Sequence, residues 1–168
     1  MTTLFAQPYD VSACGFYFDS FEDYSDKASN LKNTHGQPVE EFEIQTIDGE
    51  EIDCAMAKAW DIHQGDIAAF FEAVDDWDEH QKLCFIIAVG ECGYSFDPAT
   101  DHPDQFDVDI YEMDSLKELA EHFVDEGFYG DIPERLQFYI DYQAIARDLA
   151  VEYSELTIAG KRFVYACW

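Results

Sequence analysis

The chain has 168 residues, of which 37 are Asp or Glu and only 9 are Lys or Arg, so its formal net charge at pH 7 is -28. Aromatic residues make up 16% of the chain, enough to build a hydrophobic core, which argues against a disordered acidic tail. Because nucleic acids and membrane surfaces are anionic, this charge argues against either as a direct ligand and favours a basic protein partner.

The first third of the chain is predicted to combine strands with one short helix. Strand-like aromatic and small residues occupy positions 8–18, and residues 21–32 fit a helix. Residues 41–47 alternate apolar and polar side chains, and the Asp-Gly pair at 48–49 favours a tight turn. We therefore expect residues 50–54 to return as the second strand of a hairpin.

The middle of the chain is predicted to be helical. Asp66 is a favourable capping residue, and the apolar side chains after it recur at the i, i+3, i+4, i+7 spacing of an amphipathic helix: Ile67, Phe70, Phe71 and Val74. A second apolar stretch at 82–89 is expected to complete a small helical hairpin. Residues 95–104 contain two prolines and are predicted to form a loop.

The last third opens with a predicted strand at 105–113, which alternates apolar and acidic side chains. A helix should follow, because Ser115 and Glu118 have the spacing of a capping box. Its apolar stripe runs up to Gly127, a residue type that ends many helices. These are the clearest helix signals in the chain.

Two more helices and a terminal hairpin are predicted after this point. Pro133 is well placed as the first residue of a helix, and residues 142–149 have the apolar spacing of an amphipathic helix. The chain closes with residues 156–158, an Ala-Gly turn at 159–160, and residues 162–167, a pattern typical of a hairpin.

These elements predict an α+β fold of three small sub-domains. Residues 1–60 are expected to form an α+β sub-domain, residues 61–103 a helical sub-domain with an acidic loop, and residues 104–168 a second α+β sub-domain. No apolar run approaches the length of a membrane-spanning helix, and residues 1–10 lack the basic and apolar regions of a signal peptide. We therefore predict a cytoplasmic protein.

The charge has the magnitude of a short DNA duplex. DNA carries one negative charge per roughly 1.7 Å of axis, so a net charge of -28 corresponds to about 48 Å. A compact chain of this length is only about 40 Å across, so matching DNA favours an elongated molecule. Glu118, Glu121 and Asp125 exemplify a regular row of anions, because carboxylates three and four residues apart on a helix lie roughly 5–6 Å apart. We therefore predict a highly acidic surface that imitates DNA and contains these carboxylates: Glu72, Asp75, Asp76, Glu79, Asp101, Asp104, Asp107, Asp109, Glu112, Asp114, Glu118, Glu121, Asp125 and Glu126.

The sequence contains no recognisable catalytic or metal site. Close carboxylate pairs, such as Asp75 with Asp76 or Asp107 with Asp109, are expected by chance in so acidic a chain. No nucleophile motif, phosphate-binding glycine loop, H-E-x-x-H motif or C-x-x-C pair is present. We therefore predict a protein that is not an enzyme, with no catalytic residues, no bound metal and no cofactor.

Three other interpretations of the acidity stay open. Residues 97–109 contain five Asp in a loop-like segment and allow a calcium-binding module, although the EF-hand pattern is missing. Adaptation to high salt would use the acidity for solubility alone. An acidic decoy for another DNA-binding protein, such as a nucleoid protein or a nuclease, would use the same charged surface.

Residues 119–134 read LAEHFVDEGFYGDIPE, and residues 139–149 read YIDYQAIARDL. This segment resembles the C-terminal part of the ArdA antirestriction proteins. Weaker similarity occurs at residues 18–19 and 40–44. The first third departs most from the family pattern.

The resemblance implies an elongated, three-part homodimer whose surface carboxylates imitate bent B-form DNA. Proteins of this family are encoded on mobile genetic elements and inhibit type I restriction-modification enzymes by occupying their DNA-binding groove. The resemblance therefore implies such an enzyme as the partner. It also implies a dimer contact in the C-terminal part, at the positions that match here as Phe128, Tyr129, Ile132 and Pro133.

Overall fold

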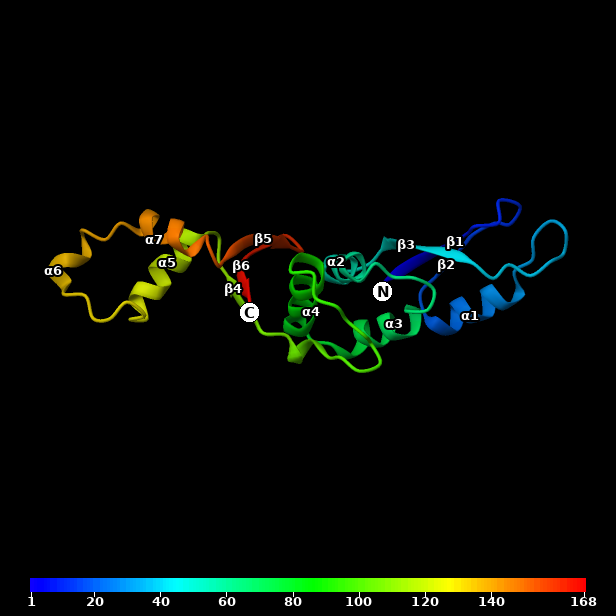
Figure 1. Cartoon of the computed structure of the whole chain (residues 1–168). Helices are drawn as coiled ribbons and strands as arrows, with labels where there is room; N and C mark the ends of the chain where they lie inside the picture. The colour runs from blue at the N-terminus through cyan, green and yellow to red at the C-terminus, as the bar shows by residue number, and fades with distance from the viewer. The chain divides into compact units, whose positions relative to one another are not determined.

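The structure is a computed structural model that describes all residues 1–168. It divides into two compact units, residues 1–106 and residues 107–168. Each unit contains a three-stranded antiparallel sheet and packs helices against it or beside it, with seven α-helices in all (Figure 1). The predicted α+β class is confirmed. None of the helices has the length and apolar character needed to cross a bilayer.

The sheet of the first unit has the strand order β2-β1-β3. Its central strand, β1 (Thr3–Pro8), pairs antiparallel with both β2 (Phe16–Phe18) and β3 (Phe42–Asp48). The strand predicted over 8–18 is wrong in its extent, because the chain reverses between β1 and β2. Asp10 stabilises this reversal by accepting hydrogen bonds from the backbone N–H and hydroxyl of Ser12, at 2.9 and 2.8 Å.

Helix α1 (Phe21–Asn30) confirms the helix predicted at 21–32, and it lies along one face of this sheet (Figure 1). It begins at Ser20, whose hydroxyl accepts a hydrogen bond from the N–H of Asp23. Its buried Tyr24 packs 5.0 Å from Phe18 and 6.1 Å from Phe42, measured between ring centroids. An aromatic cluster therefore joins the helix to the sheet.

The hairpin predicted after residue 49 is wrong. β3 ends at Asp48 as expected, but the chain then forms helix α2 (Glu51–Trp60). The residues at 50–54 alternate for too short a distance to define a strand, and the alanine-rich continuation to Trp60 favours a helix. The chain still bends at Gly49, which has a φ of +154°. Glycine is favoured there because a Cβ would lie only 2.9 Å from the hydroxyl oxygen of Thr2.

The helical part of the first unit follows the predicted order. Helix α3 (Ile67–Asp76) starts after Asp66, and its buried residues include Ile67 and Phe70. Helix α4 (Glu79–Phe85) starts with a capping box between Asp78 and Gln81, and a π-helical turn (Ile86–Glu91) continues it. Residues 82–88 are buried throughout, so this apolar stretch forms the centre of the unit.

A buried ion pair connects four segments of the first unit. The Nζ of Lys82 lies 2.7 Å from the carboxylate of Asp53 on α2 and donates to the carbonyl of Val74 at 2.9 Å. The hydroxyl of Thr2 donates to the other carboxylate oxygen of Asp53 at 3.1 Å. Both charged side chains are at most 10% exposed, so each depends on the other for neutralisation.

The second unit contains a sheet with the order β4-β6-β5. Strand β4 (Val108–Glu112) lies within the strand predicted at 105–113, after a short 3-10 turn at Pro103–Gln105. The predicted C-terminal hairpin is confirmed as β5 (Ser154–Ile158) and β6 (Lys161–Cys167), paired from Ile158 with Lys161. The core between this sheet and the helices contains these buried residues: Leu119, Phe123, Tyr153, Val164 and Ala166.

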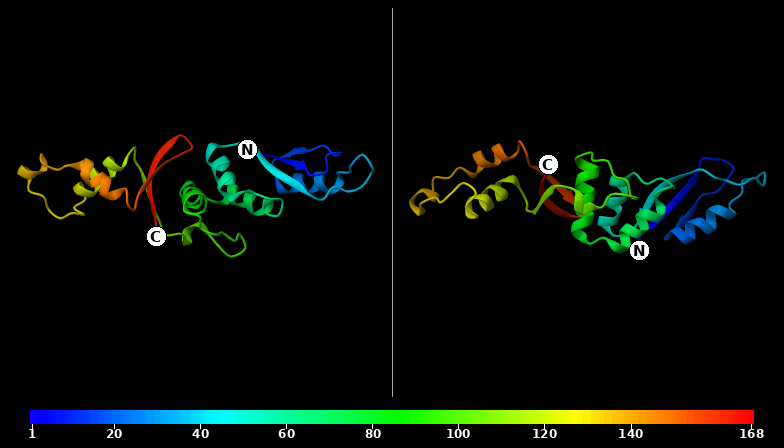
Figure 2. Two further views of the ribbon diagram at one scale, coloured as in Figure 1. Left: turned by 45° about the horizontal axis from the view of Figure 1, so that its top comes forward. Right: turned by 60° about the horizontal axis from the view of Figure 1, so that its bottom comes forward.

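Three helices complete the second unit. Helix α5 (Leu116–Asp125) confirms the predicted start at Ser115, and the chain leaves the helix through Gly127 at a φ of +78°. Pro133 immediately precedes the short helix α6 (Glu134–Gln137) rather than opening it. Helix α7 (Tyr142–Leu149) packs beside α5, and both views in Figure 2 show the α6 segment projecting beyond that pair.

Removing one partner of the buried pair should destabilise the first unit strongly. We expect Lys82→Met to lower the free energy of unfolding by about 3 kcal/mol or more, because Asp53 is left as a buried, unneutralised charge. The Asp53→Leu, Lys82→Met double variant should lose much less than the sum of the two single changes. Urea unfolding followed by circular dichroism measures all three values.

The matched control is Lys27→Met, which removes an exposed lysine that lies 2.7 Å from Asp23 on α1. This change should cost less than about 1 kcal/mol, because water already solvates both charges. If Lys27→Met and Lys82→Met lowered the free energy of unfolding equally, the buried pair would contribute no more to stability than the exposed pair.

Candidate partner-binding surface

The structure places nearly all carboxylates in contact with solvent. Of the 37 acidic side chains, Asp53 is the only one that is buried. Among the fourteen carboxylates predicted for the acidic surface, eleven are exposed and three are half-buried: Asp101, Asp109 and Glu121. These side chains are therefore accessible to a partner, and the first third of the chain contributes further exposed carboxylates that the prediction left out.

Helix α5 presents the clearest row of carboxylates. Glu118, Glu121 and Asp125 all belong to this helix, at the spacing predicted from the sequence. The carboxylate of Glu118 accepts a hydrogen bond at 2.8 Å from the N–H of Asp114. In a capping box this bond would come from the N-cap residue, Ser115, so the contact is shifted by one residue. Glu121 lies 3.4 Å from Lys117 in a solvent-accessible pair, which offsets part of the charge of Glu121.

Two carboxylates of the second unit also have structural roles. Asp109 on β4 accepts a hydrogen bond from the indole N–H of Trp168 at 3.0 Å, which holds the end of the chain against the sheet. Glu155 on β5 was not predicted as a functional residue. It accepts the N–H of Leu116 at 2.8 Å and lies 3.1 Å from Arg162, so it helps to cap α5 from the neighbouring sheet.

The acidic loop of the first unit is organised by its own carboxylates. Asp101 accepts the N–H of Asp97 at 2.8 Å, and Asp97 accepts the N–H of Ala99 at 2.9 Å. The side chain of Gln81 donates to the carboxylate of Asp104, at 3.1 and 3.2 Å to its two oxygens. No group of three or more His, Cys, Asp or Glu side chains is arranged to hold a metal ion.

Comparison with protein families places the chain among known proteins. A family model described as antirestriction protein (ArdA) matches residues 15–161, which covers most of both units. The chain belongs to the ArdA family of antirestriction proteins. A comparison with curated proteins returned no match. The family match extends well beyond the C-terminal segment in which the sequence resemblance was recognised, and it includes β2 and α1 of the first unit.

In this ArdA-family protein, the segment after α5 exposes aromatic side chains. Phe128 is 67% exposed and Tyr129 is 53% exposed, whereas Ile132 is half-buried. Phe128 also stacks on the core residue Phe123, with ring centroids 4.6 Å apart. The segment continues past Pro133, and its next exposed apolar residues are ones that the sequence prediction missed: Leu136, Phe138 and Tyr139.

The phenol of Tyr153 lies in the core of the second unit, next to acidic groups. Its pKa is raised to about 12, chiefly by burial and also by the nearby Tyr111, Asp109 and Glu152. Burial likewise raises the pKa of Tyr111. Folding therefore favours the neutral phenols, and deprotonation of Tyr153 would place a new negative charge beside existing carboxylates.

We expect the second unit to lose stability above pH 10. An unfolded tyrosine titrates near pH 10, so a folded pKa of about 12 stabilises the protein fully below pH 10, and this contribution is lost between pH 10 and 12. The loss should be on the order of 2 kcal/mol, measured as the fall in the free energy of unfolding. Tyr153→Phe should flatten this fall, whereas Tyr9→Phe, a control at an exposed tyrosine of the first unit, should leave it unchanged.

Proposed function

We propose that the protein inhibits type I restriction-modification enzymes by occupying their DNA-binding groove with carboxylates that imitate the phosphates of B-form DNA. Membership of an antirestriction family supports a restriction-modification enzyme as the partner. The observation that supports mimicry best is the distribution of charge. Apart from the paired Asp53, every acidic side chain is exposed or half-buried, in a chain with a net charge of -28.

The proposed mechanism depends on counterion release. A basic groove that binds DNA gains free energy because ions condensed on the phosphates return to solution. A protein with carboxylates at a similar linear density provides the same gain without offering a bond that the enzyme can cut. Matching about 1.7 Å per charge calls for an elongated molecule. We therefore propose an elongated arrangement of the chain.

The proposed role involves no chemistry on a substrate. Several carboxylates that could be mistaken for acid–base groups are engaged in local structure, as Asp109 is with Trp168 and Glu118 is with Asp114. The others act through their number. Each exposed carboxylate contributes little alone, because water and salt screen it over about 8 Å at physiological ionic strength.

We also propose that the protein acts as a homodimer. The exposed segment after α5 contains Phe128, Tyr129, Ile132 and Pro133, and it continues to Phe138, which is 93% exposed. Exposed apolar clusters of this kind are typical of protein interfaces. A second copy would cover these side chains, and a two-fold dimer would extend the row of carboxylates along a longer stretch of the groove.

Inhibition should decline gradually as carboxylates are removed. Glu118→Gln, Glu121→Gln or Asp125→Asn alone should change the concentration for half-displacement of DNA by less than about threefold. The triple variant should weaken displacement further, and additional neutralisations further still. The measurement is a titration in which the protein displaces labelled duplex DNA from a purified type I restriction-modification enzyme.

Salt dependence provides the control for this titration. Displacement by the wild-type protein should weaken as salt rises, and the slope should become shallower in the triple variant. Failure of the folded protein to displace DNA at any salt concentration would contradict the proposal and leave a decoy for another DNA-binding protein as the next candidate. A single neutral substitution that abolishes inhibition without unfolding would contradict distributed mimicry.

The dimer proposal is tested by changing exposed apolar residues. We expect Tyr129→Ser combined with Ile132→Ser to convert the dimer to a monomer at micromolar concentration, because the interface loses its apolar contacts. Analytical ultracentrifugation measures the mass directly. The control is Val11→Ser in the first unit, where the side chain is 99% exposed. A wild-type protein that sediments as a monomer would refute the dimer.

A further inference from the structure

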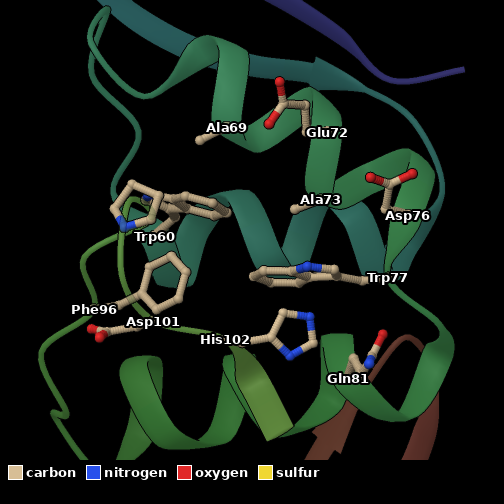
Figure 3. Close-up of a pocket in the computed structure, with 11 residues that line it drawn as sticks. Trp60, Ala69, Glu72, Ala73, Asp76, Trp77, Gln81, Phe96, Asp101 and His102 are labelled. Carbon is tan, nitrogen blue, oxygen red and sulfur yellow. The ribbon is translucent and has the colours of Figure 1, made fainter. Parts of the chain in front are cut away.

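The first unit contains a cavity that none of the predicted roles explains. It has a volume of about 280 Å³ and lies entirely within residues 60–102. Its walls include the indole rings of Trp60 and Trp77 and the ring of Phe96, and its polar groups come from Glu72, Asp76, Gln81, Asp101 and His102. Figure 3 shows the two indoles between α3 and the segment that carries Phe96 and His102.

The aromatic walls are held in place by the core. Trp60 and Trp77 lie nearly parallel, with ring centroids 5.9 Å apart and an angle of 13° between the planes. Phe96 stands edge-on to both, at 5.1 and 5.9 Å, and Phe85 packs against both rings from the buried helix α4. These contacts fix the positions of the rings before a ligand binds, which lowers the entropic cost of binding.

One face of α3 supplies both space and charge. Residues 69, 72, 73 and 76 fall at i, i+3, i+4 and i+7, read Ala, Glu, Ala and Asp, and all line the cavity. Figure 3 shows Ala69 and Ala73 nearer to the indoles and Glu72 and Asp76 farther from them. Asp101 adds a third carboxylate from the acidic loop. None of the residues that line the cavity is Lys or Arg. The histidine of the lining, His102, lies 3.2 Å through its Nδ1 from Asp104. No permanent cation of the cavity wall therefore neutralises the three carboxylates.

This combination of aromatic faces and carboxylates selects an organic cation. Anions such as nucleotides would be repelled, and the carboxylates are not grouped to hold a metal ion. Guanidinium suits the cavity better than an ammonium group, because it is planar, weakly hydrated, stacks on aromatic rings and forms paired hydrogen bonds with carboxylates. We propose that the cavity receives an arginine side chain of the restriction-modification enzyme, stacked on the indoles and neutralised by Glu72, Asp76 and Asp101.

This inference rests on the proposed function, because a basic partner has to supply the arginine. It also assigns a local role to three carboxylates of the acidic surface. Glu72, Asp76 and Asp101 would bind a specific side chain, whereas the remaining carboxylates would contribute through overall charge. Glu72 and Asp76 lie one turn apart on α3 and can be neutralised together. Neutralising these two should therefore cost more than neutralising two comparable carboxylates elsewhere.

The cavity can be tested without the enzyme. The three tryptophans of the chain are Trp60, Trp77 and Trp168, so 5-fluorotryptophan labelling gives three fluorine NMR signals. Titration with N-acetyl-arginine methylamide should shift the Trp60 and Trp77 signals saturably and leave Trp168 unshifted. The neutral citrulline analogue should produce no saturable shift. Equal responses to the arginine and citrulline probes, or none to the arginine probe, would overturn the inference.

A pair of double variants provides the matched comparison. Glu72→Gln with Asp76→Asn removes the carboxylates of the cavity, and Glu22→Gln with Asp26→Asn removes two exposed carboxylates at the same i, i+4 spacing on α1. We expect the first variant to weaken binding of the arginine probe about tenfold and the second less than twofold. Equal weakening by both would show that general charge, rather than the cavity, binds the probe.

The same variants separate this inference from the proposed function. In the displacement titration, Glu72→Gln with Asp76→Asn should weaken displacement of DNA more than the α1 variant does. One outcome is that the wild-type protein displaces DNA while the two double variants weaken displacement equally. In that case no arginine of the enzyme binds in the cavity, so this inference fails and the proposed function stands. If the probe binds but the wild-type protein displaces no DNA, the proposed function and the assigned partner fail, and the guanidinium site itself stands.

Discussion

The exclusion of carboxylates from the interior is the constraint on which the rest of the structure depends. A buried carboxylate costs several kcal/mol unless a positive charge and hydrogen bonds compensate it, and this chain has only nine Lys and Arg. One of those nine, Lys82, is used to neutralise Asp53 at 2.7 Å between α2 and α4. All other carboxylates lie at the surface, where water and salt reduce their mutual repulsion.

Aromatic packing provides the cohesion that this surface charge opposes. In the first unit, Tyr24 joins α1 to the sheet, and Phe85 packs beneath the indoles of Trp60 and Trp77. In the second unit, Phe123 and Tyr153 pack edge-on, with ring centroids 5.9 Å apart. Large aromatic side chains bury much apolar surface per residue, so small units can remain folded although many of their residues are charged.

Individual carboxylates differ in what they do, despite their shared charge. Asp97 and Asp101 order a loop, Asp109 anchors Trp168, and Glu155 caps α5 from another element. Glu72 and Asp76 border an aromatic cavity. The proposed imitation of DNA is therefore compatible with local roles for single carboxylates, because a carboxylate that accepts a hydrogen bond retains its negative charge and still contributes to the field.

The sequence by itself determined the α+β class, the helix after Ser115, the C-terminal hairpin and the resemblance to ArdA, because caps, turns and apolar periods are local signals. It failed at residues 50–54, where the Asp-Gly turn signal suggested a returning strand but the chain forms the start of helix α2. Only the tertiary structure decided which carboxylate is buried with Lys82, which ones hold N–H groups, and that Trp60, Trp77 and Phe96 meet beside Glu72 and Asp76. Such contacts join residues far apart in the chain, and no local pattern records them.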